Sequence, residues 1–508
     1  MTRPVPTPVR VVAVDLGATS GRVMAAEVGP DLLDLTEVHR FPNGAVEVGG
    51  SLRWDVRRLH REILTGIRLA ADAGPVHGIG IDSWAVDHGL LDARRRLLGS
   101  PYSYRDPRTD GVAAQVLETI DAAELYDRTG VQQLPFNTIY QLVASARSGA
   151  LDDAATMLLL PDLLGFWLTG QVGAERTNAS TTGLYDVRGR SWATDLADRV
   201  GVPGAILPPL RSAGDRVGTL LPEIAAELGL DGDVPVIAVG SHDTASAVVA
   251  VPAGAEPSAY VSSGTWSLVG LELDEPVLTD AARAADFTNE GGVDGTVRFL
   301  KNVMGLWVLS ESLRAWADDA VPGADLATLL RTAAEAEPLR TVVDINDPSL
   351  LRPGTRSDPM PARVAVLAAA AGEPAPRTPA QLARCVLDSL ALAYRRHVRE
   401  AAALAGVAVE VVHVVGGGSR NDLLCQLTAD ACGLPVLAGP AEASALGNVL
   451  VQARALGVDL PDLAAMRALV RGTHQVRRFE PRTDLDWGRA EDRLTPGHDS
   501  PIHDGVHR

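Results

Sequence analysis

The first residues that could do chemistry lie near the start of the chain, where an aspartate precedes a small polar loop. Asp15 interrupts the apolar run VVAVDL, and the loop GATSG at residues 17–21 follows it. Since a carboxylate is rare inside a buried strand, we expect Asp15 to lie where the strand ends in a polar crevice. The glycines and hydroxyls of the loop bring backbone N–H groups close to an anion. The pattern indicates a phosphate-binding turn, and a plain β-hairpin is the alternative.

The residues after this loop distinguish it from two common phosphate sites. Residues 22–28 (RVMAAEV) predict a second strand, whereas a Walker loop and a dinucleotide fingerprint both place the phosphate at a helix N-terminus. The pattern returns after a linker-like segment at residues 251–258, where a strand leads into the loop SSGT at residues 262–265 and a second strand leaves it. Two such loops could hold a triphosphate from both sides, and two unrelated hairpins are the alternative.

A third loop, GGG at residues 416–418, follows the predicted strand VEVVHVV and precedes a predicted helix. Apolar residues at helical spacing predict another helix over residues 381–405. Successive glycines let a flat ring lie against the backbone, which here would be the adenosine of a nucleotide, although a tight turn explains them equally well. As evidence for a nucleotide site, this loop matters because it follows two other glycine-containing loops, at residues 17–21 and 262–265.

Acidic side chains also lie at or after the ends of two other predicted strands. Asp243 follows VPVIAVGSH, and because Asp-Thr precedes the small-residue segment SAVVA, the residues alone favour a helix N-cap. Trp84 lies between Asp82 and Asp87 in DSWAVD. The indole face suits the C–H side of a sugar and the acids suit its hydroxyl groups, and a core tryptophan is the alternative.

Length and composition limit the class of protein. A chain of 508 residues predicts two large domains, and a net charge of -18 argues against a nucleic-acid or anionic-membrane partner. The three cysteines lack metal-ligand spacing and predict reduced core residues. No apolar run reaches membrane-spanning length, and residues 1–10 show no signal core, so we expect a cytoplasmic protein.

Strands and helices alternate along the chain, which predicts an α/β protein. The expected strands are residues 9–16, 22–28, 32–41 and 76–83; the expected helices include 56–73 and 157–170; and residues 234–252 read as a strand followed by a helix. We expect an N-terminal domain over 1–251, a C-terminal domain over 252–480 and a charged tail over 481–508.

Taken in order, DLGATSGR, SSGTWSL and VVGGGSRN resemble the nucleotide-binding segments of the actin/Hsp70/sugar-kinase superfamily, and the motifs between them resemble the FGGY carbohydrate kinases. The resemblance runs from about Val11 to Ala455. The further segments that carry it are GIDSWAVDHGLLD, YRDPRTDG, TGVQQLPFNTIYQL, ERTNASTTGLYD, SHDTASAVVAVP, TNEGG, LKNVMGLWVLSESL, LARCVLDSLALAY and EASALGN.

This resemblance implies two actin-like (ribonuclease H-like) domains, each a mixed sheet flanked by helices, with an interdomain cleft. It also implies transfer of the γ-phosphate of ATP, with Mg²⁺, to the primary hydroxyl of L-rhamnulose, as in the family members nearest in motif. The alternatives are a sister kinase for fuculose, xylulose or glycerol, and a non-catalytic nucleotide-driven protein of the actin or Hsp70 kind. We expect a small sugar and ATP as partners, and a monomer or homodimer.

The family's functional residues carry over by position. The resemblance assigns Asp243 as the catalytic base and Asp15 to a water-bridged magnesium ion. It suggests as sugar-binding residues Asp82, Trp84, Ala85, Asp87, His242, Asp243 and Thr244. It suggests as nucleotide-binding residues Ala18, Thr19, Ser20, Gly21, Arg22, Thr265, Asn302, Gly417 and Gly418.

The chain departs from the family pattern around the expected sugar pocket. Ala85 stands where relatives carry glycine, and His88 stands where an aromatic or small residue is common. Both changes bear on the identity of the sugar. Arg105 and Asp106 could bind hydroxyl groups, but an internal ion pair is the favoured interpretation.

Overall fold

The computed structural model describes residues 8–319, 321 and 325–494. The expectations for the first seven residues and for residues 495–508 of the tail lie outside this range. The chain divides into two compact units, each built from separated segments. The first unit comprises Met1–Ala250, Glu272–Phe299 and Ala443–His474, and the second comprises Val251–Leu271, Leu300–Glu442 and Gln475–Arg508.

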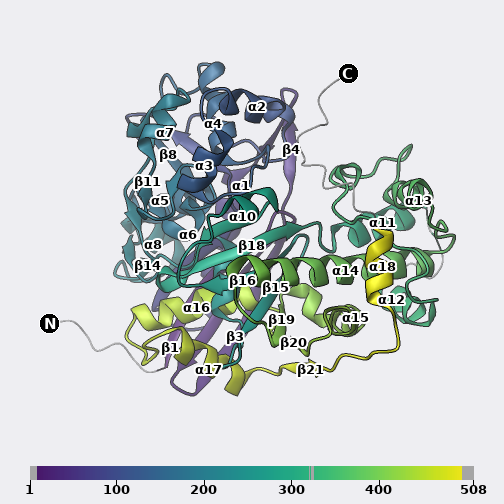
Figure 1. The fold of residues 1–508 in the computed structure, drawn as a ribbon. Coiled ribbons are helices and arrows are strands. Elements are labelled where there is room, and N and C mark those ends of the chain that lie inside the picture. Colours follow the sequence, from purple (N-terminus) through teal and green to yellow (C-terminus); the bar gives the residue numbers. More distant parts are fainter. Residues whose placement is uncertain (1–7, 320, 322–324, 495–508) are drawn as a thin grey trace. The chain divides into compact units, whose positions relative to one another are not determined.

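The elements of the first unit are labelled in Figure 1 where there is room. Its strands are β1 Val9–Leu16, β2 Ser20–Gly29, β3 Leu32–Pro42, β4 Ala45–Val48, β5 Ser51–Trp54, β6 Gly78–Ser83, β7 His88–Leu91, β8 Thr156–Leu159, β9 Ala174–Glu175, β10 Tyr185–Asp186, β11 Ser191–Trp192, β12 Leu210–Arg211, β13 Arg216–Thr219, β14 Pro235–Ile237 and β17 Thr288–Gly291. Its helices are α1 Val56–Asp72, α2 Val112–Leu117, α3 Ala122–Thr129, α4 Thr138–Arg147, α5 Leu160–Thr169, α6 Arg176–Ala179, α7 Thr194–Arg199, α8 Pro222–Leu228, α9 Asp243–Val249, α10 Asp280–Ala284, α16 Ala443–Ala455 and α17 Leu463–Thr473.

The second unit has fewer strands and longer helices. Its strands are β15 Ser258–Ser263, β16 Ser267–Leu273, β19 Val411–Val415, β20 Val436–Ala438 and β21 Arg477–Phe479, and β18 Val297–Val303 runs into it from the first unit. Its helices are α11 Trp307–Asp318, α12 Leu326–Glu335, α13 Met360–Ala370, α14 Pro379–Ala405, α15 Asp422–Cys432 and α18 Trp487–Arg493.

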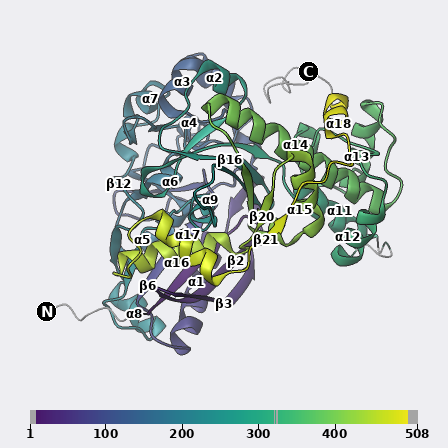
Figure 2. The same ribbon diagram turned by 60° about the horizontal axis from the view of Figure 1, so that its bottom comes forward.

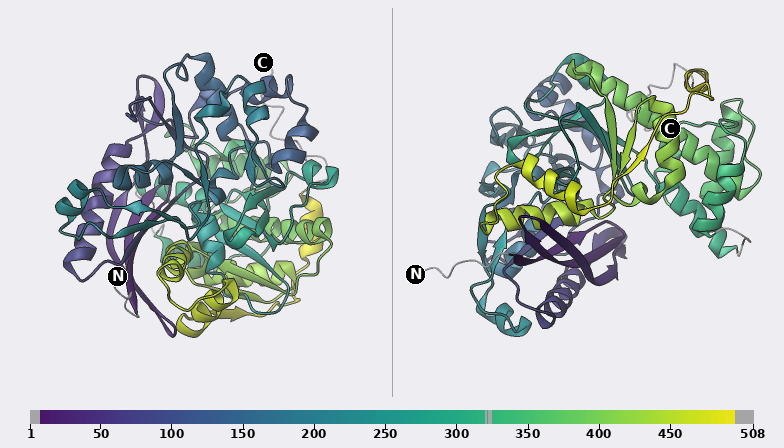
Figure 3. Two further views of the ribbon diagram at one scale, coloured as in Figure 1. Left: turned by 90° about the vertical axis from the view of Figure 1, so that its left-hand side faces the viewer. Right: turned by 90° about the horizontal axis from the view of Figure 1, so that it is seen from below.

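A mixed sheet in the order β13-β14-β6-β1-β2-β3 forms the centre of the first unit. Its central strand β1 is antiparallel to β2 and parallel to β6. β1 is apolar on both faces because helices cover both sides of the sheet. The right-hand view of Figure 3 shows α1 in purple on one face and α16 and α17 in yellow-green on the other.

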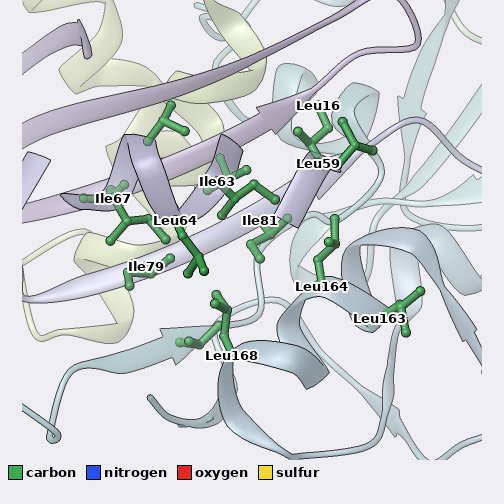
Figure 4. Packing of buried hydrophobic residues seen from close by; sticks show 14 of the residues in the cluster. Leu16, Leu59, Ile63, Leu64, Ile67, Ile79, Ile81, Leu163, Leu164 and Leu168 are labelled. Atoms are coloured by element: carbon green, nitrogen blue, oxygen red, sulfur yellow. The ribbon is translucent and has the colours of Figure 1, made fainter. Parts of the chain in front are cut away.

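The face of this sheet that carries α1 holds a large apolar core. Figure 4 shows side chains of α1, β6 and α5 directed toward one another, with Ile63, Ile79 and Leu164 among them. α1 begins at the N-cap Asp55, whose carboxylate accepts a hydrogen bond from Arg58 N at 2.9 Å. This core fixes the carboxyl ends of β1 and β6, where Asp15 and Asp82 lie opposite each other in register.

The second unit repeats the opening pattern of the first. β15 is antiparallel to β16 and parallel to β19, as β1 is to β2 and β6. The strands β16, β15, β19, β20 and β21 follow one another in this order. Figure 2 shows α15 beside β20 and β21, and α15 contacts both strands. The predicted strand-loop-strand units at residues 9–28 and 258–273 are confirmed, and so is the expectation of mixed sheets flanked by helices.

One element differs from its prediction. A single helix was expected over residues 157–170, but Met157 to Leu159 belong to strand β8, which pairs with β7. The helix α5 begins only at Leu160 because Pro161 in its first turn sets a helical φ, while Leu159 is extended with ψ 156°. Its end at Gly170, in the left-handed conformation with φ 70°, is as expected.

Two further findings concern the cysteines and the helices. The cysteines Cys385, Cys425 and Cys432 are free and buried, as predicted. Within residues 8–319, 321 and 325–494, no helix combines the length and the apolar character needed to cross a bilayer.

Helix α9 packs closely against α16 at a glycine. A Cβ built on Gly447 would lie 1.8 Å from the carbonyl oxygen of Ser246. We therefore expect Gly447→Ala to force the two helices apart and to lower the free energy of unfolding by about 1–3 kcal/mol. Because α9 begins at Asp243, the shift should move this residue as well. Chemical denaturation measures the effect, with Gly472→Ala as the matched control because its Cβ meets no atom within 4 Å; an equal cost for both variants would contradict the packing argument.

Candidate functional site

The loop after β1 is closed by its own backbone and by an asparagine. Gly17 N donates to the Ser20 carbonyl at 2.9 Å, and Asn43 donates from its side chain to the Gly17 carbonyl at 2.8 Å and from its backbone N to the Thr19 carbonyl at 2.9 Å. The Thr19 side chain is exposed. Gly21 has no room for a side chain, because a Cβ would lie 2.3 Å from the ring of Phe41. The loop is thus a rigid turn with an exposed hydroxyl at its tip.

Three aspartates gather at the strand ends beside this loop. Asp15 is 4% exposed and forms an ion pair with Arg22 at 2.5 Å, while Asp82 is fully buried. Burial raises the pKa of Asp82 well above its ordinary value, and the charges of Asp15 and Asp243 raise this pKa further. Asn448 of α16 opposes the shift by donating to Asp82 Oδ2 at 2.6 Å.

The side chains around Asp15 determine whether a metal ion could be bound directly or through water. Among the described residues, no group of three or more His, Cys, Asp or Glu side chains is placed to hold a metal directly. Oδ1 of Asp82 is buried and finds no hydrogen-bond partner among these residues, and it lies in the field of two further carboxylates. Magnesium keeps most of its water shell and needs only one or two carboxylates in phosphate sites. The residues fit a hydrated cation held through water and do not fit a direct cage.

Asp243 is the first residue of α9, and its side chain is 28% exposed. Thr244 Oγ1 donates to Asp243 Oδ1 at 3.1 Å, and His242 Nε2 lies 3.6 Å from the same oxygen. Burial raises the pKa of Asp243, while His242, Thr244 and Arg298 act in the opposite direction. A partly exposed carboxylate with a raised pKa and fixed neighbours is suited to accept a proton.

A buried ion pair holds the ring of His242. His242 Nδ1 lies 3.2 Å from Glu290 Oε2 and 3.1 Å from Arg298 Nη2, and Arg298 and Glu290 are 2.9 Å apart. Arg298 is fully buried and also donates to the Gly291 carbonyl. Burial alone raises the pKa of Glu290, but the Arg298 guanidinium and the bond from His242 leave it below its ordinary value. The imidazole therefore has one fixed orientation, with Nε2 directed to Asp243.

Trp84 is held in a buried polar frame. Its indole stacks at a tilt on Trp54 with ring centroids 4.3 Å apart, and both indole N–H groups donate to Asp87 Oδ2. Tyr104 N donates to the same oxygen, and Gln141 Nε2 donates to Asp87 Oδ1 at 2.9 Å. Burial raises the pKa of Asp87 to about 6 against these four donors. Asp87 therefore orients Trp84 through bonds within the protein.

The turn between Trp84 and Asp87 is strained. Val86 has φ 66°, a rare conformation for a β-branched residue, and Asp87 N donates to the Ala85 carbonyl across it. Thr138 Oγ1 holds the turn by donating to the Val86 carbonyl at 2.7 Å. Ala85, at the head of this turn, is half-buried. Strain of this kind is maintained only where the surroundings enforce it, which is common at binding sites.

His88 and the pair Arg105-Asp106 lie near this frame. His88 is 5% exposed, and burial followed by the charge of Arg108 lowers its pKa to about 3, so its ring is neutral. Asp106 accepts from Leu52 N at 2.6 Å and from Arg108 N at 3.0 Å. Asp106 thereby ties β5 to the turn that contains Arg108.

The second unit brings together two of the three predicted loops. Parallel pairing of β15 with β19 places Ser262 opposite Val415, so the loop at residues 264–266 and the GGG loop leave the same edge of the sheet. A Cβ on Gly418 would lie 2.0 Å from Ser263 Oγ, so only glycine allows this contact, whereas a Cβ on Gly417 would meet nothing within 4 Å. Gly417 thus leaves open space beside the backbone.

Thr265 and Asn302 lie close to that edge. Trp307 N, at the start of α11, donates to the Thr265 carbonyl at 3.2 Å. Asn302 is the penultimate residue of β18, and Gly305, three residues on, packs against the backbone of Trp266. The predicted residues therefore form one group in each unit: residues 15–22, 82–87 and 242–244 in the first, and residues 265, 302 and 417–418 in the second.

Several residues of the first-unit group carried no role in the sequence interpretation. Glu290, Arg298, Gln141 and Asn448 contact predicted site residues, yet each lies far from its partner in the sequence. The available signal was a charged or amide residue inside an otherwise apolar element, such as Arg298 in VRFLKNV.

Comparison with protein families matches both halves of the chain. Residues 10–250 match the N-terminal domain of the FGGY family of carbohydrate kinases, and residues 259–456 match its C-terminal domain.

Curated proteins similar to this chain cover nearly its whole length. It is 41% identical over 481 residues to a rhamnulokinase of Bacteroides thetaiotaomicron, covering 94% of this chain and 97% of that protein. It is 44% identical over 482 residues to a rhamnulokinase of Pectobacterium carotovorum, covering 94% of each.

Solved structures share the fold at lower identity. A gluconate kinase of Lactobacillus acidophilus superposes with a TM-score of 0.76 at 16% identity, covering 96% of both chains. A xylulose kinase of Rhodospirillum rubrum superposes with a TM-score of 0.75 at 21% identity, covering 96% of this chain and 97% of the other.

Proposed function

We propose that this chain, which belongs to the FGGY family of carbohydrate kinases, transfers the γ-phosphoryl group of ATP to the primary hydroxyl of L-rhamnulose. The products are L-rhamnulose 1-phosphate and ADP. The observation that carries the choice of sugar is the 41% and 44% identity to two rhamnulokinases over 94% of the chain. The geometry around Asp243 supports the chemistry, because a phosphoryl acceptor needs a carboxylate to take its proton.

Asp243 is the proposed base. The sugar hydroxyl gives its proton to this carboxylate as its oxygen attacks phosphorus, and the ADP oxygen leaves. Thr244 and His242 hold the carboxylate and offer hydrogen bonds to neighbouring sugar hydroxyls. Trp84 presents an apolar face to the sugar, and the Ala85 methyl limits the space beside it. Asp82 and Asp87 complete the proposed pocket, with Asp87 acting through the indole that it orients.

For the nucleotide, we assign the phosphates to Ala18, Thr19, Ser20, Gly21 and Arg22 in the first unit. Thr265 and Asn302 in the second unit are assigned to the nucleotide as well. The adenosine is assigned to Gly417 and Gly418, where the open space beside Gly417 supports a flat ring. Magnesium, when bound, supplies positive charge that offsets the phosphate oxygens, and Asp15 is the residue assigned to hold its water shell.

The remaining expectations belong to the same proposal. A small sugar and ATP are the proposed partners, without nucleic acid or membrane. We place the enzyme in the cytoplasm, where ATP is present and where three free buried cysteines stay reduced. The active form is a monomer or a homodimer.

The proposal is tested by measuring ADP release with ATP, Mg²⁺ and a panel of L-rhamnulose, L-fuculose, D-xylulose, glycerol and gluconate. L-rhamnulose should give the highest kcat/KM of the panel. A higher value with another acceptor would reassign the sugar, and no release above ATP hydrolysis with any of them would remove the kinase assignment for these acceptors.

The acid limb of the pH profile offers a separate prediction. Burial raises the pKa of Asp243 above 3.8, so protonation disables the base at a higher pH than for an ordinary aspartate. We expect kcat/KM to fall toward acid with an apparent pKa above 3.8 and to rise as pH increases. Initial rates measured between about pH 4 and about pH 8 give the profile. A flat profile down to the ordinary aspartate range would contradict the assignment.

A further inference from the structure

Glu175 lies directly behind the segment that carries Asp243. It is the last residue of β9 and is 1% exposed. Its Oε2 accepts hydrogen bonds from the backbone N and the hydroxyl of Ser241, both at 3.0 Å. The same oxygen accepts from Thr177 N at 3.0 Å, which caps the first turn of α6. One buried carboxylate oxygen thus joins α6 to the residue two positions before the proposed base.

Thr177 extends the contacts of Glu175 by one residue, and we call these two side chains the anchor. Its hydroxyl donates to Glu175 Oε2 and accepts a hydrogen bond from His242 N at 3.3 Å. The backbone N–H groups of Ser241 and His242 are therefore both bound by one pair of side chains. Because α9 begins at the next residue, these two bonds set where Asp243 enters the helix.

The opposite side of the same peptide is bound by the segment that carries Trp84. The Ser241 carbonyl accepts from Ser83 N at 2.9 Å and from Asn178 Nδ2 at 3.3 Å. Ser83 precedes Trp84. Ser241 is thus held from both sides. On the Glu175 side, side-chain oxygens accept hydrogen bonds from the N–H groups of Ser241 and His242 and from the Ser241 hydroxyl.

A small cavity lies beside Glu175. Glu175, Ser241 and Asp162 are among its lining residues, and the cavity has room for about two water molecules. Glu175 Oε1 and Asp162 Oδ2 are buried and find no hydrogen-bond partner among the described residues. Asp162 Oδ1 accepts from Glu175 N at 3.2 Å, so Asp162 is bound to the same strand end but makes no hydrogen bond to residues 241–243. This makes Asp162 a natural comparison for Glu175.

We propose that Glu175 is a positioning residue for phosphoryl transfer, which fixes the backbone at Ser241 and His242 so that Asp243 meets the sugar hydroxyl in line. The inference rests on the proposed function only for the role of Asp243. The residues assigned to ATP lie elsewhere, so the KM for ATP should change little and the loss should fall on kcat. A base displaced by about 1 Å costs on the order of 100-fold in rate.

Three variants distinguish a positioning role of Glu175 from the general effect of altering a buried carboxyl group. Glu175→Ala removes all four bonds and should lower kcat by roughly 100-fold with little change in KM for ATP. Glu175→Gln keeps an acceptor oxygen facing Ser241 and should retain activity within about tenfold of the native chain. Asp162→Asn alters the neighbouring buried carboxyl, which makes no hydrogen bond to residues 241–243, and should leave kcat unchanged. Full kcat in Glu175→Ala, or equal losses in Glu175→Ala and Asp162→Asn, would overturn the proposal.

Thr177→Val provides the same test if Glu175→Ala does not fold. Valine has nearly the shape of threonine but removes the hydroxyl that joins Glu175 to His242 N. It should lower kcat by about tenfold, in line with the loss of one hydrogen bond that acts only on position. Thr177→Ser, which keeps the hydroxyl, should restore kcat, and unchanged kcat in Thr177→Val would count against the anchor.

Hydrogen exchange tests the anchor without any activity. The amides of Ser241 and His242 should exchange faster in Glu175→Ala or in Thr177→Val than in the native chain, because they lose their acceptors. Unchanged exchange in both variants would refute the anchor. If the native chain transfers phosphate to no sugar while exchange rises as expected, the proposed function fails and the structural part of the inference stands.

Discussion

Asp243→Asn lowers kcat by about two to four orders of magnitude, since loss of a general base costs this much. The amide cannot accept the proton of the sugar hydroxyl, although it keeps the size of the carboxylate. Thr244 Oγ1 can still donate to the amide oxygen, so the start of α9 is preserved. We expect the KM for ATP to change little.

Initial-rate kinetics and thermal unfolding together check this result. Asp231→Asn is the matched control, because Asp231 is an exposed aspartate of the same unit. It should leave both kcat and the melting temperature unchanged. Near-native kcat in Asp243→Asn would show that another group takes the proton.

Arg298→Met lowers the free energy of unfolding by about 3–5 kcal/mol, because it leaves Glu290 buried without its cation. The side chain of Arg298 is fully buried, so water cannot replace it. His242 loses one of its two fixed neighbours, and kcat should fall with stability.

Two further variants make this prediction specific. The double variant Arg298→Met/Glu290→Gln removes the uncompensated charge and should regain much of the lost stability. Arg331→Met breaks an exposed pair with Glu335, whose side chain is 71% exposed, and should cost less than about 1 kcal/mol. Equal costs for Arg298→Met and Arg331→Met in urea denaturation would contradict the account of the buried pair.

Local patterns were sufficient for most of the fold. The run VRVVAVDL predicted β1, since a strand that helices cover on both faces is apolar on both faces. The spacing of apolar residues predicted α1. The segment at residues 157–170 was misassigned because its apolar residues are continuous, and such a run fits a strand and a helix equally well. Only the pairing of β8 with β7 and the position of Pro161 decide where the helix starts.

The residues of the candidate site were also predictable from the sequence only in part. Asp15 and Asp82 were recognisable because each lies at the carboxyl end of a strand, and Asp243 because it follows one. Most contacts of Asp87 were not, since three of its four donors, Trp54, Tyr104 and Gln141, come from segments that only the folded chain brings together. A local pattern names a residue type at a strand end, but its partners depend on long-range packing.

The most direct test of the account is ³¹P NMR of the products formed from ATP, Mg²⁺ and L-rhamnulose. Transfer to the primary hydroxyl predicts one new phosphomonoester signal, coupled to the C1 protons of the sugar, in an amount equal to the ADP formed. Inorganic phosphate with unchanged L-rhamnulose, or a phosphate on another carbon, would contradict the account.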